Sequence, residues 1–139
     1  SFNRYSVKGS NVYYSGHSQF TFADLQNLQG IGCSPGIAIG SVRLITGRDS
    51  LNSVKRGEIV VCRNFRPAWS IILGRISGLV IEGANVLSHG AILAREYQVP
   101  TVVNVVGISK VLDTKDVIEI NGSSGELRLI RKMGSAYDS

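Results

Sequence analysis

Only one of the two histidines in this 139-residue sequence has neighbours that suit chemistry. His89 follows a short apolar run at residues 78–81 and directly precedes a segment with helical character. In α/β domains, the loops between a strand and the next helix usually carry the reactive groups. A neutral imidazole has a free nitrogen lone pair near pH 7, so it can act as a nucleophile. The other histidine, His17, lies in a polar turn and is expected to be a solvated surface residue.

The residue before His89 favours one chemistry in particular. Ser88 is a good N-cap, so we expect His89 to project from the first turn of a helix over residues 89–97. A phosphoryl group on that imidazole would carry about two negative charges. Free backbone N–H groups and the helix dipole would stabilise them. The spacing alone also fits a histidine that merely caps the helix or packs against its start.

Other reaction chemistries have weaker support. The sequence contains no G-x-S-x-G nucleophile elbow, no G-x-G-x-x-G pattern and no Walker loop. Cys33 and Cys62 have no CxxC pattern and no histidine at metal-ligand spacing, so we expect two buried thiols and neither a disulfide nor a zinc site. Glu82, Glu96 and Asp113 do not show the paired spacing of acid–base catalysis.

The composition predicts a single packed domain, with 43% hydrophobic and 18% charged residues. No apolar run approaches the ~18 residues of a membrane span, and the amino terminus lacks the apolar core of a signal peptide. We therefore expect a cytoplasmic protein that does not bind membranes. The net charge of +5 raises nucleic-acid binding as a hypothesis. The basic residues are dispersed, however, so we expect a solvated basic surface and no nucleic-acid partner.

The remaining pattern predicts an α/β domain with a partly antiparallel sheet and short helices. Residues 1–29 are expected to be a lead-in arm or the tail of a preceding domain, with a strand at 12–14 and a helix over 21–29. The main domain is expected over residues 30–131, and a tail over 132–139. Its strands are expected at 37–46, 58–62, 78–81, 101–103, 116–120 and 126–130, the last two forming a hairpin. A helix from Pro67 is expected to bury one stripe, made of Trp69, Ile72, Leu73 and Ile76.

Three segments carry recognisable motifs in a fixed order. Residues 33–36 read C-S-P-G and are followed by Gly40, and residues 116–125 read D-V-I-E-I-N-G-S-S-G. Between them, residues 87–97 read L-S-H-G-A-I-L-A-R-E-Y, and residues 100–103 read P-T-V-V. Together they resemble the phosphohistidine domain of the phosphoenolpyruvate-utilising enzymes. The likeness covers about residues 30–130 and leans toward the phosphoenolpyruvate synthase (pyruvate, water dikinase) and rifampin phosphotransferase branches.

This resemblance implies a swivelling β/β/α domain in which His89 is the phosphoryl carrier. Ser88, Gly90 and Arg95 would stabilise the phosphate, although Arg95 could equally anchor a loop. An ATP-grasp domain of the same enzyme would load His89, and a separate domain would bind the acceptor. ATP and magnesium are expected on those partner domains, and this domain is expected to bind no cofactor or metal. Alone, it is expected to be inactive.

The sequence departs from the family pattern just before the histidine. Ala84 and Asn85 stand where the family usually has two glycines, and Leu87 stands where some members carry a regulatory threonine. Asparagine tolerates positive φ and alanine is small, so the turn itself can survive. The departure nevertheless motivates a second hypothesis, a non-catalytic swivelling or docking module whose carrier loop has drifted. A chain that begins with Ser is also expected to be processed or to be part of a longer protein.

Overall fold

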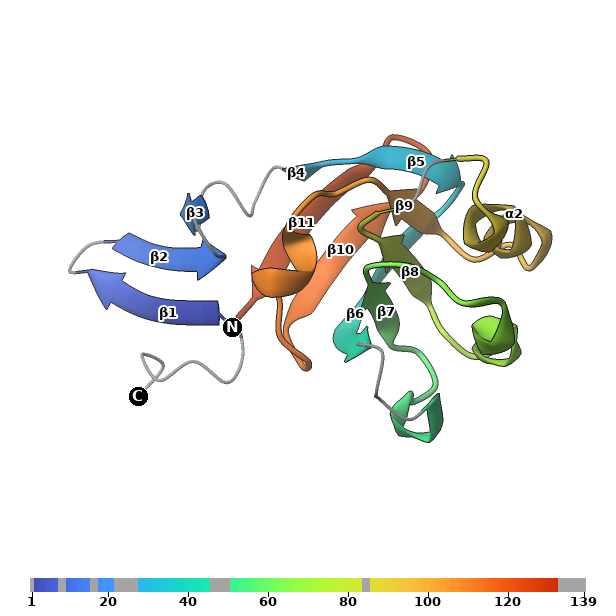
Figure 1. The fold of residues 1–139 in the computed structure, drawn as a ribbon, viewed down its shortest axis with the longest axis horizontal. Helices are drawn as coiled ribbons and strands as arrows, with labels where there is room; N and C mark the ends of the chain where they lie inside the picture. The colour runs from blue at the N-terminus through green and yellow to red at the C-terminus, as the bar shows by residue number, and fades with distance from the viewer. Residues whose placement is uncertain are drawn as a thin grey trace.

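The computed structural model describes residues 2–7, 10–15, 18–21, 28–45, 51–83 and 86–132. The first three strands, β1 (Phe2–Val7), β2 (Ser10–Ser15) and β3 (Ser18–Thr21), form an antiparallel sheet in chain order (Figure 1). The strand predicted at residues 12–14 is therefore confirmed. His17 lies outside the described residues. The predicted boundaries at residues 30 and 131 stay predictions.

The prediction of a helix over residues 21–29 is wrong at both ends of that range. Thr21 ends strand β3, and Leu28–Gln29 forms strand β4. Leu28 pairs with Leu127 of a strand far along the chain and packs against the core. This long-range pairing overrides the local capping pattern, while residues 22–27 lie outside the described part of the chain.

The main sheet has eight strands in the order β4-β11-β10-β6-β7-β8-β9-β5. Its pairings are parallel from β6 through β7 and β8 to β9 and antiparallel elsewhere, so the predicted mixed α/β fold is confirmed. The remaining strands are β5 (Ile31–Ser34), β6 (Ile37–Ile45), β7 (Ile59–Cys62), β8 (Gly78–Ile81), β9 (Thr101–Val103), β10 (Val117–Asn121) and β11 (Glu126–Arg131).

The two edges of this sheet meet at one residue. Strands β4 and β5 lie at opposite ends of the strand order, yet only Gly30 separates them in the chain. The sheet must therefore curl until its edges come together (Figure 1). A Cβ at Gly30 would lie 2.5 Å from Cγ2 of Val105 and 2.7 Å from Cγ1 of Val102. Glycine thus allows the chain to pass between the edges.

Burial patterns explain the positions of the strands. Every residue of β7, β8 and β9 is buried, as expected of central parallel strands covered on both faces. Strand β10 alternates between buried and half-buried residues, and β11 buries Leu127 and Leu129 while its other residues are exposed. The hairpin predicted from the sequence is confirmed, and it covers the core with one face only.

The helices of the described residues are short, and one of them is an α-helix. The described helices are η1 (Leu51–Ser53), η2 (Pro67–Ile72), α2 (His89–Glu96) and η3 (Ile108–Lys110). The stripe predicted after Pro67 is buried, but η2 is a 3-10 helix closed by bonds such as Leu73 N–H to Ser70 O (3.1 Å). None of the described helices is long and apolar enough to cross a bilayer.

Two apolar clusters lie on the two faces of the curled sheet. One contains Val61 and Val80 with residues of η3 and the β10–β11 hairpin. The other contains Val60 and Ile81 with residues of η2 and α2, which lie beside each other (Figure 1). Successive strand residues alternate between these two clusters. Helix α2 is consequently held against the outer face of the sheet, next to η2.

Candidate functional site

His89 is the first residue of α2 and its side chain is exposed. Strand β8 ends at Ile81, so the loop that leads to the histidine leaves the carboxyl end of a parallel strand. Ser88 is the N-cap, as predicted: its hydroxyl accepts a bond from the Ala91 N–H at 3.3 Å. Its carbonyl accepts a bond from the Ile92 N–H at 3.0 Å. The imidazole forms no hydrogen bond or ion pair with the rest of the described chain.

The start of α2 keeps two unused hydrogen-bond donors. The first N–H groups of an α-helix have no partner within the helix. Ser88 satisfies those of Ala91 and Ile92, whereas the backbone N–H groups of His89 and Gly90 have no acceptor among the described residues. An anion at this helix end could therefore accept bonds from them.

Gly90 sets how closely the helix approaches the sheet. It is buried, and a Cβ there would lie 2.7 Å from Cβ of Phe65 and 3.1 Å from Cδ1 of Ile81. Phe65 itself packs edge-to-face on Trp69, with ring centroids 5.8 Å apart. The first turn of α2 thus rests on the loop after β7.

Arg95 fastens the loop before the histidine. Its Nη2 atom donates a 2.7 Å bond to the carbonyl of Val86, while the side chain remains exposed. The arginine therefore joins the last turn of α2 to the chain that enters its first turn. Ala84 and Asn85, the departures from the family pattern, lie outside the described residues.

The two thiols are buried, as predicted. Burial and the nearby Glu82 charge raise the pKa of Cys62 to about 12. Burial raises the pKa of Cys33, and the positive charge of Arg95 only partly opposes this. Over the described part of the chain, no three His, Cys, Asp or Glu residues cluster as metal ligands would.

Glu82, Glu96 and Asp113, the carboxylates considered in the sequence analysis, lie in different surroundings and do not form a pair. Glu82 is buried and accepts bonds from the backbone N–H groups of Gly107 and Ser109, each at 3.0 Å. Asp113 lies 3.5 Å from the buried ammonium of Lys132, and Glu96 is exposed at the end of α2. Glu82 is thus a structural anchor that the sequence analysis missed, although an acidic residue directly after a buried strand is a signal for one.

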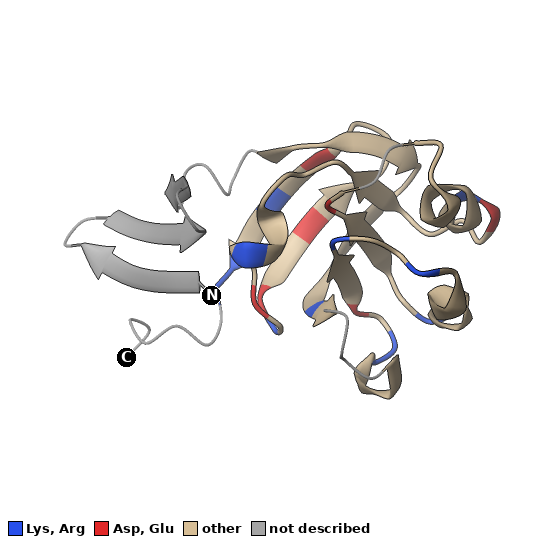
Figure 2. Cartoon of the chain, in the orientation of Figure 1, with Lys and Arg blue, Asp and Glu red and all other residues tan. Residues whose placement is uncertain are grey.

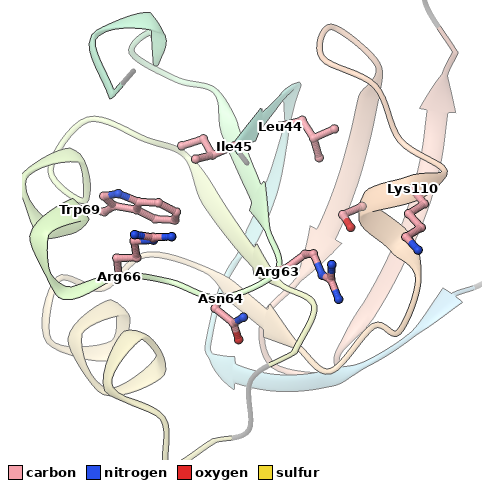
Figure 3. Close-up of a pocket in the computed structure, with 8 residues that line it drawn as sticks. Leu44, Ile45, Arg63, Asn64, Arg66, Trp69 and Lys110 are labelled. Carbon is pink, nitrogen blue, oxygen red and sulfur yellow. The ribbon is translucent and has the colours of Figure 1, made fainter. Parts of the chain in front are cut away.

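The structure also shows a pocket that the sequence did not predict. It has a volume of about 440 Å³ and opens beside the carboxyl ends of β6 and β7 (Figure 3). Its lining residues are Leu44, Ile45, Arg63, Asn64, Arg66, Trp69, Ser109 and Lys110. Three of them are basic: Arg63 and Arg66 lie in the loop after β7, and Lys110 ends η3.

Comparisons with known proteins agree with this fold. Residues 54–125 match the model of the family described as "PEP-utilising enzyme, mobile domain". The "Uncharacterized phosphotransferase YvkC" of Bacillus subtilis is 31% identical over 74% of this chain. The "Rifampicin phosphotransferase" of Bacillus cereus is 32% identical over 73%, and the "Probable phosphoenolpyruvate synthase" of Methanothermobacter thermautotrophicus is 33% identical over 70%. The chain matches only 12–14% of the length of these three relatives.

Solved structures share the fold at lower identity. The aconitase X of Thermococcus kodakaraensis aligns over 76% of this chain and 98% of its own, with a TM-score of 0.58 and 18% identity. An Enzyme I structure aligns over 65% of this chain and 37% of its own, with a TM-score of 0.52 and 20% identity. These likenesses show a shared architecture and not a shared activity. The family match and the curated relatives go further: the chain belongs to the mobile-domain family of the phosphoenolpyruvate-utilising enzymes.

Proposed function

We propose that this chain is the phosphoryl-carrier domain of an ATP-dependent phosphotransferase of the phosphoenolpyruvate synthase kind, with His89 as the carrier. One observation supports this most strongly. The exposed imidazole at the first position of α2 forms no hydrogen bond with the described residues, and two backbone N–H groups beside it lack an acceptor among them. That arrangement suits a side chain that receives a negatively charged phosphoryl group and later passes it on.

The proposed step is a phosphoryl transfer to nitrogen. A ring nitrogen of neutral His89 attacks the phosphorus, an N–P bond forms, and the P–O bond to the departing group breaks with its electron pair. The cationic ring loses the proton of its other nitrogen to water. The N–H groups of His89 and Gly90 and the dipole of α2 stabilise the phosphoryl charge. The reverse step passes the group to an acceptor.

The neighbours of His89 have positioning roles in this proposal. Ser88 caps the helix and fixes the direction of its first turn. Gly90 leaves room for that turn on Phe65 and offers its N–H group to the phosphate. Arg95 acts through its bond to the Val86 carbonyl, which holds the preceding loop. Its contribution to phosphate binding is thus mainly through loop position.

The other participants belong to parts of the enzyme outside this chain. We assign ATP and magnesium to an ATP-grasp domain and the acceptor to a further domain. The length of the relatives supports this, since each is several times longer than the matched segment. Pyruvate and an antibiotic of the rifampicin type are the two candidate acceptors, because relatives of both kinds match equally well. ATP as phosphoryl donor is consistent with a cytoplasmic enzyme.

Labelling with radioactive ATP tests the proposal in the full-length enzyme. The expected result is one phosphate per chain that is labile in acid and stable in base, as a phosphohistidine is. His89→Asn should abolish the label, whereas His17→Asn, which replaces the other histidine, should keep it. Undiminished label on the His89→Asn enzyme would overturn the assignment.

The same preparation separates the acceptors and the docking hypothesis. Adding pyruvate or rifampicin to the labelled enzyme should discharge it with only one of the two. A full-length enzyme that takes no label from ATP with magnesium, although it is folded, would favour the non-catalytic docking module. Restoring two glycines with Ala84→Gly and Asn85→Gly would then show whether the departure before the histidine is the cause.

A further inference from the structure

The pocket beside β6 and β7 carries positive charge that no described acidic side chain neutralises. Arg63, Arg66 and Lys110 line it, and all three are exposed. None of them forms an ion pair with a carboxylate in the described part of the chain. Figure 2 marks basic residues in the loop after β7 and in η3, the segments that carry these three residues. Unpaired cations that converge on a concavity attract an anion.

The same pocket has an apolar and aromatic wall. Trp69 is buried except for a small exposed face, and the Arg66 guanidinium lies 5.8 Å from its ring centroid (Figure 3). Leu44 and Ile45, at the end of β6, complete this wall. A volume of about 440 Å³ falls in the range of small-molecule sites. The pocket therefore suits a compact ligand with one charged end and one apolar end.

Two consecutive residues hold the walls of the pocket together. The N–H group of Gly83 donates a 2.8 Å bond to the Arg63 carbonyl and thus fixes the β7 loop. Both carboxylate oxygens of Glu82 accept backbone N–H groups, those of Gly107 and Ser109, and thus fix η3, which carries Lys110. The backbone segments that carry the basic residues are therefore held by hydrogen bonds before a ligand binds. This lowers the entropic cost of binding.

We propose that this pocket binds a small organic phosphate. Its phosphate group lies between Arg63, Arg66 and Lys110, and its apolar part lies against Trp69. A phosphate dianion matches several converging cations better than a single carboxylate does, and guanidinium groups bind phosphate oxygens through paired N–H donors. His89 is not among the lining residues of the pocket, and the proposal does not use the phosphoryl-carrier role.

Phenyl phosphate is a suitable probe because it combines both ends of the expected ligand. Trp69 is the only tryptophan in the sequence, so its fluorescence reports directly on the pocket. Titration of the 139-residue chain should give a saturable fluorescence change. Inorganic phosphate should bind more weakly, and phenol should not bind measurably. Phenol binding as tight as that of phenyl phosphate would overturn the proposal, because the cations would then contribute nothing.

Matched charge variants complete the test. Arg63→Gln with Lys110→Gln should raise the Kd for phenyl phosphate about tenfold or more, since two charge-assisted bonds are lost. Arg56→Gln with Arg131→Gln removes the same charge from exposed positions outside the pocket lining, and its Kd should stay within about twofold of the parent. An equal loss in both variants, or a failure to saturate in the parent, would overturn the proposal.

Two further measurements keep the result interpretable. His89→Asn should bind phenyl phosphate as the parent does, so a failed carrier assignment and a failed pocket assignment give different results. If the pocket variant does not fold, measurements on the parent chain alone still test the proposal. Phenyl phosphate must bind the parent more tightly than phenol does, and its binding must weaken with added salt.

Discussion

Gly90 lies so close to Phe65 that a side chain at residue 90 would have no room, and this close approach sets the position of the helix that carries His89. A methyl group at residue 90 would lie 2.7 Å from the Phe65 Cβ and 3.1 Å from its Cδ2. No real Cβ contact is as short as the first of these, so the helix or the ring would have to move. The position of His89 therefore depends on the absence of a side chain at the next residue.

Gly90→Ala should lower the free energy of unfolding by about 1–2 kcal/mol. Overpacking of a buried site costs ~1–3 kcal/mol, and the better helix propensity of alanine recovers up to ~1 kcal/mol. Urea unfolding of both proteins measures the difference. Gly74→Ala is the control, because nothing lies within 4 Å of a Cβ there, and its midpoint should barely change. An unchanged urea midpoint for Gly90→Ala would show that Phe65 can move aside at no cost in stability, and it would contradict the predicted overpacking.

Glu82→Gln should also lower the free energy of unfolding, by about 1–3 kcal/mol. The amide has one acceptor oxygen, so it can satisfy the N–H group of Gly107 or of Ser109 but not both. Glu96→Gln is the matched control, since Glu96 is exposed on α2 and should change stability by less than about 0.5 kcal/mol. Equal urea midpoints for the two variants would contradict the anchoring role of Glu82.

The elements that the sequence predicted correctly are those with a strong local signal. Strands β7, β8 and β9 are short apolar runs bounded by polar or turn residues, and such runs suit buried parallel strands. The start of α2 was predicted because Ser88 is a good N-cap followed by helix-forming residues. In both cases the physical cause lies within a few residues.

The features that the sequence could not predict depend on distant partners. The sequence predicts a helix at Leu28, whereas the strand there forms by pairing with Leu127, a partner that no local pattern reveals. The pocket likewise joins Arg63 and Lys110, which are separated in the chain by strands β8 and β9 and by helices η2 and α2. Solitary basic residues resemble ordinary solvated charges until the fold brings them together.

Acid should weaken the protein partly through Glu58. Burial opposes its charge, but hydrogen bonds from Arg43 and from the Lys55 N–H outweigh this and hold the pKa of Glu58 below its usual value. A carboxyl whose pKa is lower in the folded state stabilises the fold above its unfolded pKa of about 4.3. That contribution is lost as the pH falls through the folded pKa.

Urea unfolding at about pH 7 and about pH 3 measures this effect. The parent should lose more stability between the two pH values than Glu58→Gln, which has no charge to lose. Glu96→Gln should behave as the parent does, because that side chain is exposed. Identical pH dependence in the parent and Glu58→Gln would contradict the expected linkage.

Lys132→Met should be among the most destabilising substitutions near the carboxyl end. The buried Lys132 ammonium donates bonds to Asp116 (2.7 Å) and to the Val111 carbonyl (2.6 Å). Removing one partner of a buried ion pair costs about 3–5 kcal/mol. Arg131→Met, one residue earlier and exposed, should cost much less in the same urea measurement. Equal effects would show that the pair adds no stability beyond that of a surface charge.

Both thiols should be inert in the folded protein. Thiolate is the reactive form, and with its pKa raised to about 12 Cys62 is ionised in only about one molecule in ten thousand at pH 8. Burial both raises the pKa of Cys33 and limits access to it. Ellman's reagent at that pH should therefore release almost no chromophore from the native chain and two equivalents from the urea-unfolded chain, which has two cysteines. Glu82→Gln removes the charge that helps to raise the Cys62 pKa, so any residual reaction should become faster in that variant. Rapid stoichiometric labelling of the native parent would mean that the cover formed by η2 and α2 opens readily.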